Sequence, residues 1–86
     1  MKKFIMYTKP TCAFCIKAKN LLAERGFQFE DRVVGLNYNA GDVRSHCTKL
    51  NESASVKTVP QIIFVDDGVE TYVGGYTELR ATIDRY

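Results

Sequence analysis

The fold is decided by one stretch, FIMYTKPTCAFC at residues 4–15, which runs from an apolar segment into two cysteines. Residues 3–8 carry the apolar run of a buried strand, and residues 13–25 have the amphipathic pattern of a helix. Two cysteines with two residues between them bind a metal, form a structural disulfide, or cycle between dithiol and disulfide. Their position between a strand and a helix favours cycling, because the start of a helix stabilises a thiolate.

The two cysteines are expected to differ in role. Cys12 lies at the predicted helix start, where it faces unpaired backbone N–H groups, and Lys9 adds positive charge three residues earlier. These features predict that Cys12 is the nucleophile. Cys15 lies one turn inside the helix on the core-facing side, which places it to resolve a mixed disulfide formed on Cys12. The alternative of two reduced, inert thiols stays open at this point.

Length and composition indicate one small, soluble domain that covers residues 1–86. The chain is 45% hydrophobic and 26% charged, and its net charge of +2 is too weak to indicate a nucleic-acid partner. The first apolar run ends at Tyr7, which is too short for a signal sequence, and no run approaches the length of a membrane span. Three cysteines are fewer than a secreted scaffold of this size usually carries. We therefore expect a cytoplasmic protein without a membrane partner.

The remaining elements follow from periodicity and turn residues. We expect a strand at 27–33, a helix after the loop at 35–41, strands at 61–65 and 69–73, and a last helix at about 77–85. Asn39 or Asp42 caps the second helix, and Asp66-Asp67-Gly68 joins the last two strands as a hairpin. The order is β-α-β-α-β-β-α, with a parallel first pair and an antiparallel hairpin. This predicts an α/β protein in which helices flank a four-stranded mixed sheet, the thioredoxin-like arrangement.

The segment Thr58-Val59-Pro60 precedes the third predicted strand. A proline cannot donate a hydrogen bond to a strand ladder, so it belongs at the start of a strand. Local sequence favours an ordinary trans bond, because only about 5–6% of X-Pro bonds in folded proteins are cis. The alternative is a cis turn beside the cysteines that leaves the Val59 backbone free to pair with an extended thiol peptide.

The segment Gly74-Gly75-Tyr76-Thr77-Glu78 joins the end of a strand to the start of a helix. Glycines allow close backbone approach, and a helix start offers N–H donors to an anion. A plain turn with Thr77 as the N-cap is the alternative, so the segment alone is a weak indication of a binding site.

Taken together, these segments resemble the dithiol glutaredoxins over nearly the whole chain. The matching pieces are Lys9, Cys12-Ala13-Phe14-Cys15, Thr58-Val59-Pro60-Gln61-Ile62 and Gly74-Gly75-Tyr76-Thr77-Glu78. Each piece is moderately specific, whereas all of them in this order in a short chain are strongly specific. The resemblance implies a cis Pro60, against the expectation from local sequence.

The resemblance also implies a groove that binds glutathione, the reductant and co-substrate. Its residues would be Lys9, Phe14, Val59, Pro60, Gly75, Thr77 and Glu78. Val59 would pair with the cysteinyl backbone of glutathione, and Phe14 would form an aromatic wall. Gly75, Thr77 and Glu78 would surround the γ-glutamyl end. Lys9 would approach the glycine carboxylate.

The implied activity is glutathione-dependent reduction of protein disulfides and glutathione mixed disulfides through Cys12 and Cys15. The resemblance suggests a monomer that acts on glutathionylated or disulfide-containing proteins, with ribonucleotide reductase as a client. One alternative is a [2Fe–2S] cluster carrier that uses Cys12 and glutathione. Another is a redoxin that is reduced by thioredoxin reductase instead of glutathione.

The chain departs from the family pattern at three places. Cys-Ala-Phe-Cys replaces the usual Cys-Pro-Tyr-Cys, so Ala13 frees a backbone N–H and Phe14 lacks a hydroxyl. Glu78 stands where the family commonly has Asp, which shifts the expected γ-glutamyl contact. Residues 33–57 match poorly, so no contact from the second helix is carried over.

Three residues of the second helix are interpreted as structural. Cys47 falls on an apolar stripe with Val43 and Leu50, which favours a buried thiol over a metal ligand. The adjacent His46 points about 100° away around the helix, so the two do not readily chelate one metal. We expect no metal site, and we expect Arg44 on a solvated helix face.

Overall fold

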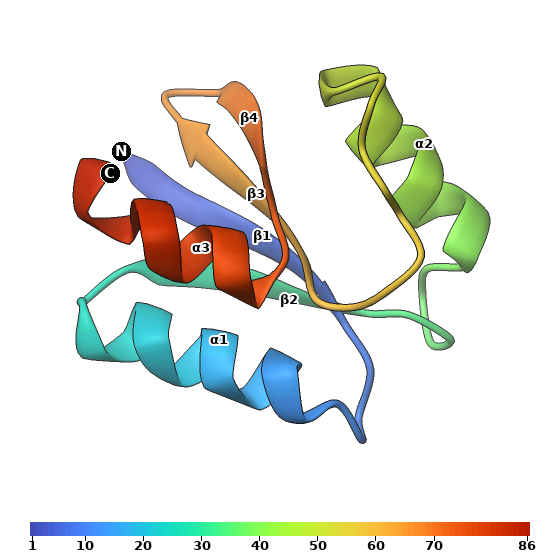
Figure 1. Cartoon of the computed structure of the whole chain (residues 1–86), viewed down its shortest axis with the longest axis horizontal. Helices are drawn as coiled ribbons and strands as arrows, with labels where there is room; N and C mark the ends of the chain where they lie inside the picture. Colours follow the sequence, from blue (N-terminus) through green and yellow to red (C-terminus); the bar gives the residue numbers. More distant parts are fainter.

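The apolar strand quoted above lies in the middle of the sheet. The computed structural model describes residues 1–86, and its sheet has the strand order β2-β1-β3-β4 (Figure 1). The elements are β1 (Lys2–Thr8), α1 (Ala13–Glu24), β2 (Gln28–Val33), α2 (Ala40–Leu50), β3 (Gln61–Asp66), β4 (Val69–Gly74) and α3 (Tyr76–Thr82), followed by a 3-10 turn, Ile83–Arg85. The predicted order of strands and helices is confirmed.

The pairing of the strands follows from their connections. β1 runs parallel to β2, which α1 connects to it, and antiparallel to β3. β3 and β4 form the predicted hairpin. Asp67 and Gly68 have φ values of 50° and 84° at its tip. Positive φ at both central residues is the requirement of a tight type I′ turn, and the Asp-Gly pair meets it.

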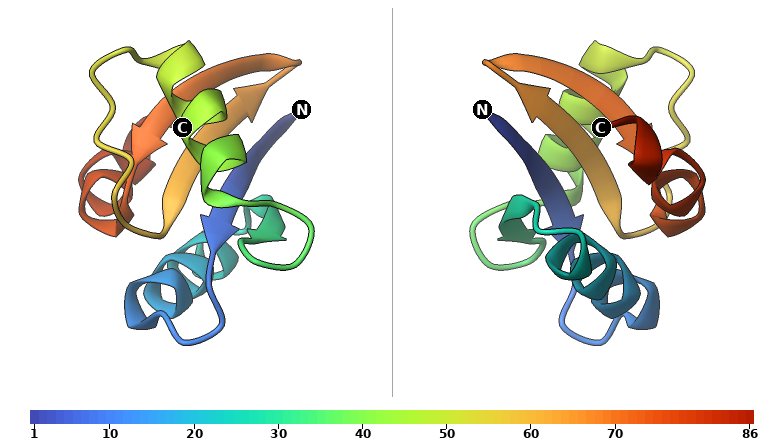
Figure 2. Two further views of the ribbon diagram at one scale, coloured as in Figure 1. Left: turned by 90° about the vertical axis from the view of Figure 1, so that its right-hand side faces the viewer. Right: turned by 90° about the vertical axis from the view of Figure 1, so that its left-hand side faces the viewer.

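Helices cover both faces of the sheet. Figure 1 and Figure 2 show α1 and α3 on one face and α2 on the other. Because side chains alternate along a strand, β1 contributes Phe4 and Met6 to the core under α1 and α3, and Ile5 and Tyr7 to the core under α2. Both hydrophobic cores therefore depend on the same strand.

A polar network attaches α2 to the sheet. His46 of α2 pairs with Glu70 of β4 through Nε2, and its Nδ1 is hydrogen-bonded to the hydroxyl of Tyr7, 2.6 Å away. Arg32 of β2 donates to the same hydroxyl at 2.9 Å. Tyr7 is buried, and this burial raises its pKa. One imidazole thus ties α2 to two strands of the sheet.

The caps of the helices refine the sequence predictions. Asn39 is the N-cap of α2, and its side chain accepts from the backbone N–H of Asp42. The Asp42 carboxylate in turn accepts from the backbone N–H of Asn39, so both candidates take part in a capping box. Gly75 is the N-cap of α3, so an N-cap at Thr77 is wrong. The last helix ends at Thr82 and continues as a 3-10 turn.

No helix of this chain combines the length and the apolar character that crossing a bilayer requires.

The core under α1 predicts the effect of a cavity. Leu22 is fully buried, and we expect Leu22→Ala to lower the free energy of unfolding by about 2–5 kcal/mol, because the removed atoms leave a void. Urea unfolding with an unchanged m-value measures this loss. Leu36 is 77% exposed, so Leu36→Ala is the matched control, with an expected change within about 0.5 kcal/mol. Equal losses in the two variants would contradict the assignment of the core.

Candidate active site

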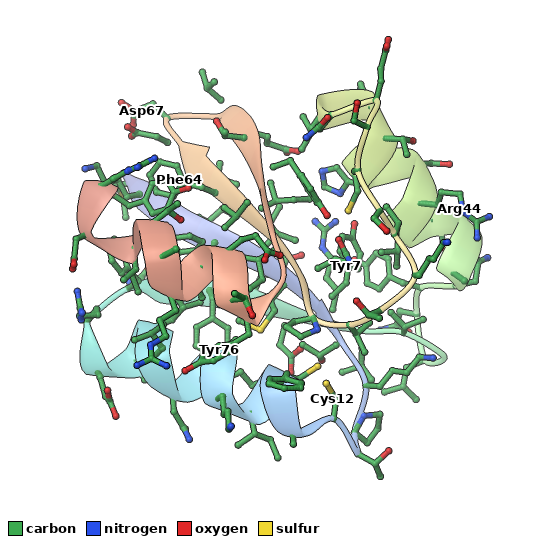
Figure 3. The ribbon with its side chains drawn as sticks, in the orientation of Figure 1. Tyr7, Cys12, Arg44, Phe64, Asp67 and Tyr76 are labelled. Carbon is green, nitrogen blue, oxygen red and sulfur yellow. The ribbon has the colours of Figure 1, made fainter.

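Cys12 is the N-cap of α1, as predicted. Its backbone is extended, and its sulfur accepts a hydrogen bond from the backbone N–H of Cys15 at 3.1 Å. The thiol also donates to the carbonyl of Val59 at 3.4 Å, across from α1 in the segment before β3. Figure 3 shows Cys12 at the start of the helix. The half-buried sulfur is therefore held where helix N–H groups favour negative charge.

Cys15 has the opposite environment. Its side chain is 1% exposed, and it packs within the protein one turn after Cys12. Burial, reinforced by the neighbouring Cys12 sulfur, raises the pKa of the Cys15 thiol to about 12. Both residues are free thiols in this structure. The accessible sulfur and the hidden sulfur are thus clearly distinguished.

An ion pair ties α1 to the sheet close to the buried cysteine. Lys19, one helical turn after Cys15, lies 2.6 Å from a carboxylate oxygen of Asp31 in β2. The other oxygen of Asp31 accepts from the hydroxyl of Thr8, at the end of β1, at 2.5 Å. This chain of contacts joins α1, β2 and β1 and holds the cysteine-bearing end of the helix against the sheet.

A groove of about 290 Å³ runs beside Cys12, close to the lower end of the range of small-ligand sites. It is lined by Phe14, Thr58, Val59, Pro60, Gly75, Tyr76, Thr77 and Glu78. Six of the seven residues predicted for the glutathione groove are in this set. The bond between Val59 and Pro60 is cis, so the isomer implied by the resemblance is confirmed and the trans form favoured by local sequence is wrong.

The groove has two aromatic walls, one of which sequence reasoning missed. Phe14 is 55% exposed, and its ring lies 6.1 Å from the ring of Tyr76. Figure 3 shows Tyr76 between α3 and α1. Tyr76 belongs to the Gly74–Glu78 segment but is not among the residues that the resemblance implies for the groove. The available signal was its position between Gly75 and Thr77, which were both predicted to line the groove.

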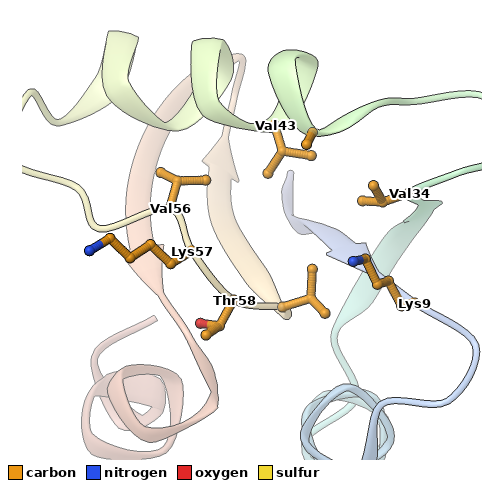
Figure 4. Close-up of a pocket in the computed structure, with 8 residues that line it drawn as sticks. Lys9, Val34, Val43, Val56, Lys57 and Thr58 are labelled. Carbon is orange, nitrogen blue, oxygen red and sulfur yellow. The ribbon is translucent and has the colours of Figure 1, made fainter.

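The predicted seventh residue, Lys9, lies in an adjoining cleft. That cleft shares Thr58 and Val59 with the groove, and Lys9 and Lys57 approach it from opposite sides (Figure 4). Val43 is among the apolar residues that line it. Lys57 was not predicted, although it directly precedes the Thr58-Val59-Pro60 segment. Two ammonium groups therefore flank one end of the site.

Glu78 folds back over the start of α3. Its carboxylate accepts from the backbone N–H of Gly75 at 2.8 Å. A Cβ atom at Gly74 would lie 2.9 Å from the same carboxylate, and Gly74 has a φ of 119°, so this position requires glycine. The paired glycines thus let the acidic side chain lie close to the backbone at the edge of the groove.

The other candidates lie away from the groove. Arg44 is exposed on the outer side of α2 and lines neither the groove nor the cleft (Figure 3). Cys47 is fully buried, and burial raises the pKa of its thiol to about 11. The chain has no group of three or more His, Cys, Asp or Glu side chains arranged to hold a metal ion.

A mixed sheet flanked by three helices, with a dithiol at the start of the first helix, defines the class of thioredoxin-fold redoxins. Within this class, the glutaredoxin family model matches residues 4–69. The chain is 39% identical over 71 residues to glutaredoxin 1 of Rickettsia conorii, covering 83% of this chain and 62% of that protein. This chain belongs to the glutaredoxin family.

Solved structures agree with this assignment. Glutaredoxin 1 from Francisella tularensis, crystallised with cacodylate, has a TM-score of 0.69 and 25% identity, covering 99% of this chain and 95% of its own. A buckwheat glutaredoxin–glutathione complex has the same fold, with a TM-score of 0.70 and 14% identity, covering 98% of this chain and 70% of its own. The chain spans 27% of a Haemophilus influenzae hybrid peroxiredoxin, to which it is 37% identical over 75 residues.

The contrast among the cysteines predicts selective alkylation. At neutral pH we expect iodoacetamide to modify Cys12 alone, because Cys15 and Cys47 are buried and their raised pKa values keep them protonated. Modification of the two buried thiols should rise only as the pH approaches about 11 for Cys47 and about 12 for Cys15. Peptide mapping by mass spectrometry measures each site. Alkylation of Cys15 at the rate of Cys12 would refute this assignment.

Proposed function

We propose that this protein is a glutathione-dependent thiol–disulfide oxidoreductase. The observation that carries the proposal is the pairing of a half-exposed Cys12 at the N-cap of α1 with a buried Cys15 three residues later. The first sulfur is accessible and faces helix N–H groups, and the second is shielded from external disulfides. This asymmetry suits a nucleophile and a resolving thiol.

With a glutathione mixed disulfide, the reaction needs Cys12 alone. The Cys12 thiolate attacks the glutathione sulfur, the disulfide of the substrate breaks, and the protein leaves as a thiolate that takes up a proton. A second glutathione thiolate then attacks the sulfur of glutathione bound to Cys12. This releases oxidised glutathione and restores the Cys12 thiolate.

With a protein disulfide, Cys15 completes the reaction. Attack by Cys12 leaves a mixed disulfide between Cys12 and the substrate. The Cys15 sulfur then attacks Cys12, which releases the substrate as a dithiol and forms a Cys12–Cys15 disulfide. The proton lost by Cys15 balances the one gained by the departing substrate thiolate. Two glutathione molecules return the dithiol, giving oxidised glutathione.

The groove supports glutathione as the reductant. The Val59 backbone is positioned beside Cys12, where an extended cysteinyl peptide can pair with it. Glu78 provides a carboxylate for the ammonium group of the γ-glutamyl end, and Lys9 and Lys57 provide charge for the glycine carboxylate. The buckwheat protein that shares this fold was crystallised as a glutathione complex, which supports glutathione as the ligand. The family resemblance makes ribonucleotide reductase the first protein client to assay.

Two cysteine variants test the roles. On a glutathionylated peptide with glutathione and glutathione reductase, we expect Cys12→Ser to reduce turnover to background. Cys15→Ser should stay within about threefold of the parent, because resolution by Cys15 is not needed. Equal loss in both variants would contradict the division of roles. Running the parent with thioredoxin reductase in place of glutathione identifies the reductant, and faster turnover there would reject glutathione dependence.

A further inference from the structure

The segment between α2 and β3 carries the Val59 backbone, and although Val56 packs against the core under α2, few hydrogen bonds hold the segment. Residues 55–60 make no backbone–backbone hydrogen bond. The Cys12 thiol contacts the carbonyl of Val59, but this sulfur is the group that reacts. The only other hydrogen bond to the segment comes from the side chain of Gln61, the first residue of β3.

Gln61 is unusual in its surroundings. It is 2% exposed in a strand whose next four residues are buried and apolar. Its amide nitrogen donates to the carbonyl of Thr58 at 2.7 Å, and its amide oxygen accepts from the hydroxyl of Tyr72 in β4 at 2.6 Å. The thiol of Cys47 lies 3.9 Å from the same oxygen. The bonds on both sides fix the orientation of the amide.

We propose that Gln61 is the positioning residue of the substrate-binding segment 58–60, and that it sets the affinity for the thiol substrate through its bond to Thr58. The proposal rests on the proposed function, because it concerns the peptide that pairs with Val59. Gln61 itself lines neither the groove nor the cleft and does not act on the sulfur.

The physical basis is pre-organisation. A substrate strand pairs with Val59 only when the backbone groups of the segment point outward in an extended arrangement. Without an internal bond, this ordering must occur during binding and weakens the affinity. Gln61 orders the segment beforehand and is itself anchored to β4 by Tyr72. An apolar residue of similar length would leave both the Thr58 carbonyl and the Tyr72 hydroxyl without this partner.

Gln61→Met tests the proposal. On the glutathionylated peptide, we expect KM to rise about 5–10-fold while kcat changes less than about twofold. Without the hydrogen bond, the segment must be ordered when the substrate binds, and this cost is the same in the bound ground state and in the transition state. The rate of Cys12 alkylation by iodoacetamide should stay within about twofold of the parent, since the variant keeps the α1 backbone N–H that faces the sulfur and loosens only the contact with Val59. Tyr72→Phe is the matched control. This variant removes only the hydrogen bond between Tyr72 and Gln61 and keeps the one between Gln61 and Thr58, so the rise in KM should be smaller.

Gln61→Glu supplies a second variant with a distinct signature. An ionised carboxylate still accepts from Tyr72 but has no hydrogen to donate to Thr58. Protonation restores this donor. We therefore expect the ratio of the variant KM to the parent KM to fall as the pH is lowered. If Gln61 only fills space, lowering the pH should not bring the variant KM closer to the parent KM. A KM ratio that is independent of pH would therefore contradict the proposal.

A measurement on the backbone separates this proposal from the proposed function. In Gln61→Met and Gln61→Glu, NMR order parameters of the amides of Lys57, Thr58 and Val59 should drop, while those of Tyr76 and Thr77 stay unchanged. Unchanged order in 57–59 together with unchanged KM would overturn the positioning role. If the parent shows no activity with glutathione, the proposed function fails, and the order parameters alone decide whether Gln61 holds the segment.

Discussion

The structure depends on the burial of β1 on both of its faces. Residues Phe4 to Thr8 are all buried, which places the strand at the centre of the sheet and gives it a part in both cores. The chain leaving Thr8 therefore starts from a rigid position and reaches Cys12 after a short connection. β3 pairs antiparallel with β1, and Tyr7 is opposite Gln61. The residues just before Gln61 must then emerge beside the cysteines, so the dithiol and the Val59 backbone meet because of one strand register.

The three-residue separation of the cysteines is enough to place one at the accessible start of the helix and the other in the protein interior. Cys12 caps the helix and receives the Cys15 N–H, whereas Cys15 turns into the protein interior and its pKa rises to about 12. The polar groups around them are attached to different elements. Asp31 connects Lys19 to Thr8 on one side, and Gln61 connects Thr58 to Tyr72 on the other. Cys12, the proposed nucleophile, is thus the most accessible of the three cysteine sulfurs.

Sequence patterns predicted the features of the fold that depend on residues close together in the chain. The element order, the cap at Cys12 and the hairpin at Asp67 and Gly68 all follow from residues close together in the chain. Contacts between distant residues were not predictable in this way, because they depend on strand register and loop path. Gln61 and Tyr72 meet across the β3–β4 pair, and Lys9 lies in a cleft with Lys57 and not in the main groove. The cis form of Pro60 came from the family resemblance, since local statistics favour the trans form.

The sheet order has a consequence for self-association. β2 and β4 are its edges, and exposed edges invite pairing with other chains. β2 carries the consecutive charged residues Glu30, Asp31 and Arg32, and β4 carries Glu70, so a like strand approaching either edge must desolvate or oppose charge. The Val59 backbone has no such protection. Charge thus disfavours pairing along both edges of the sheet, while one short stretch of backbone beside the Cys12 sulfur lacks that protection.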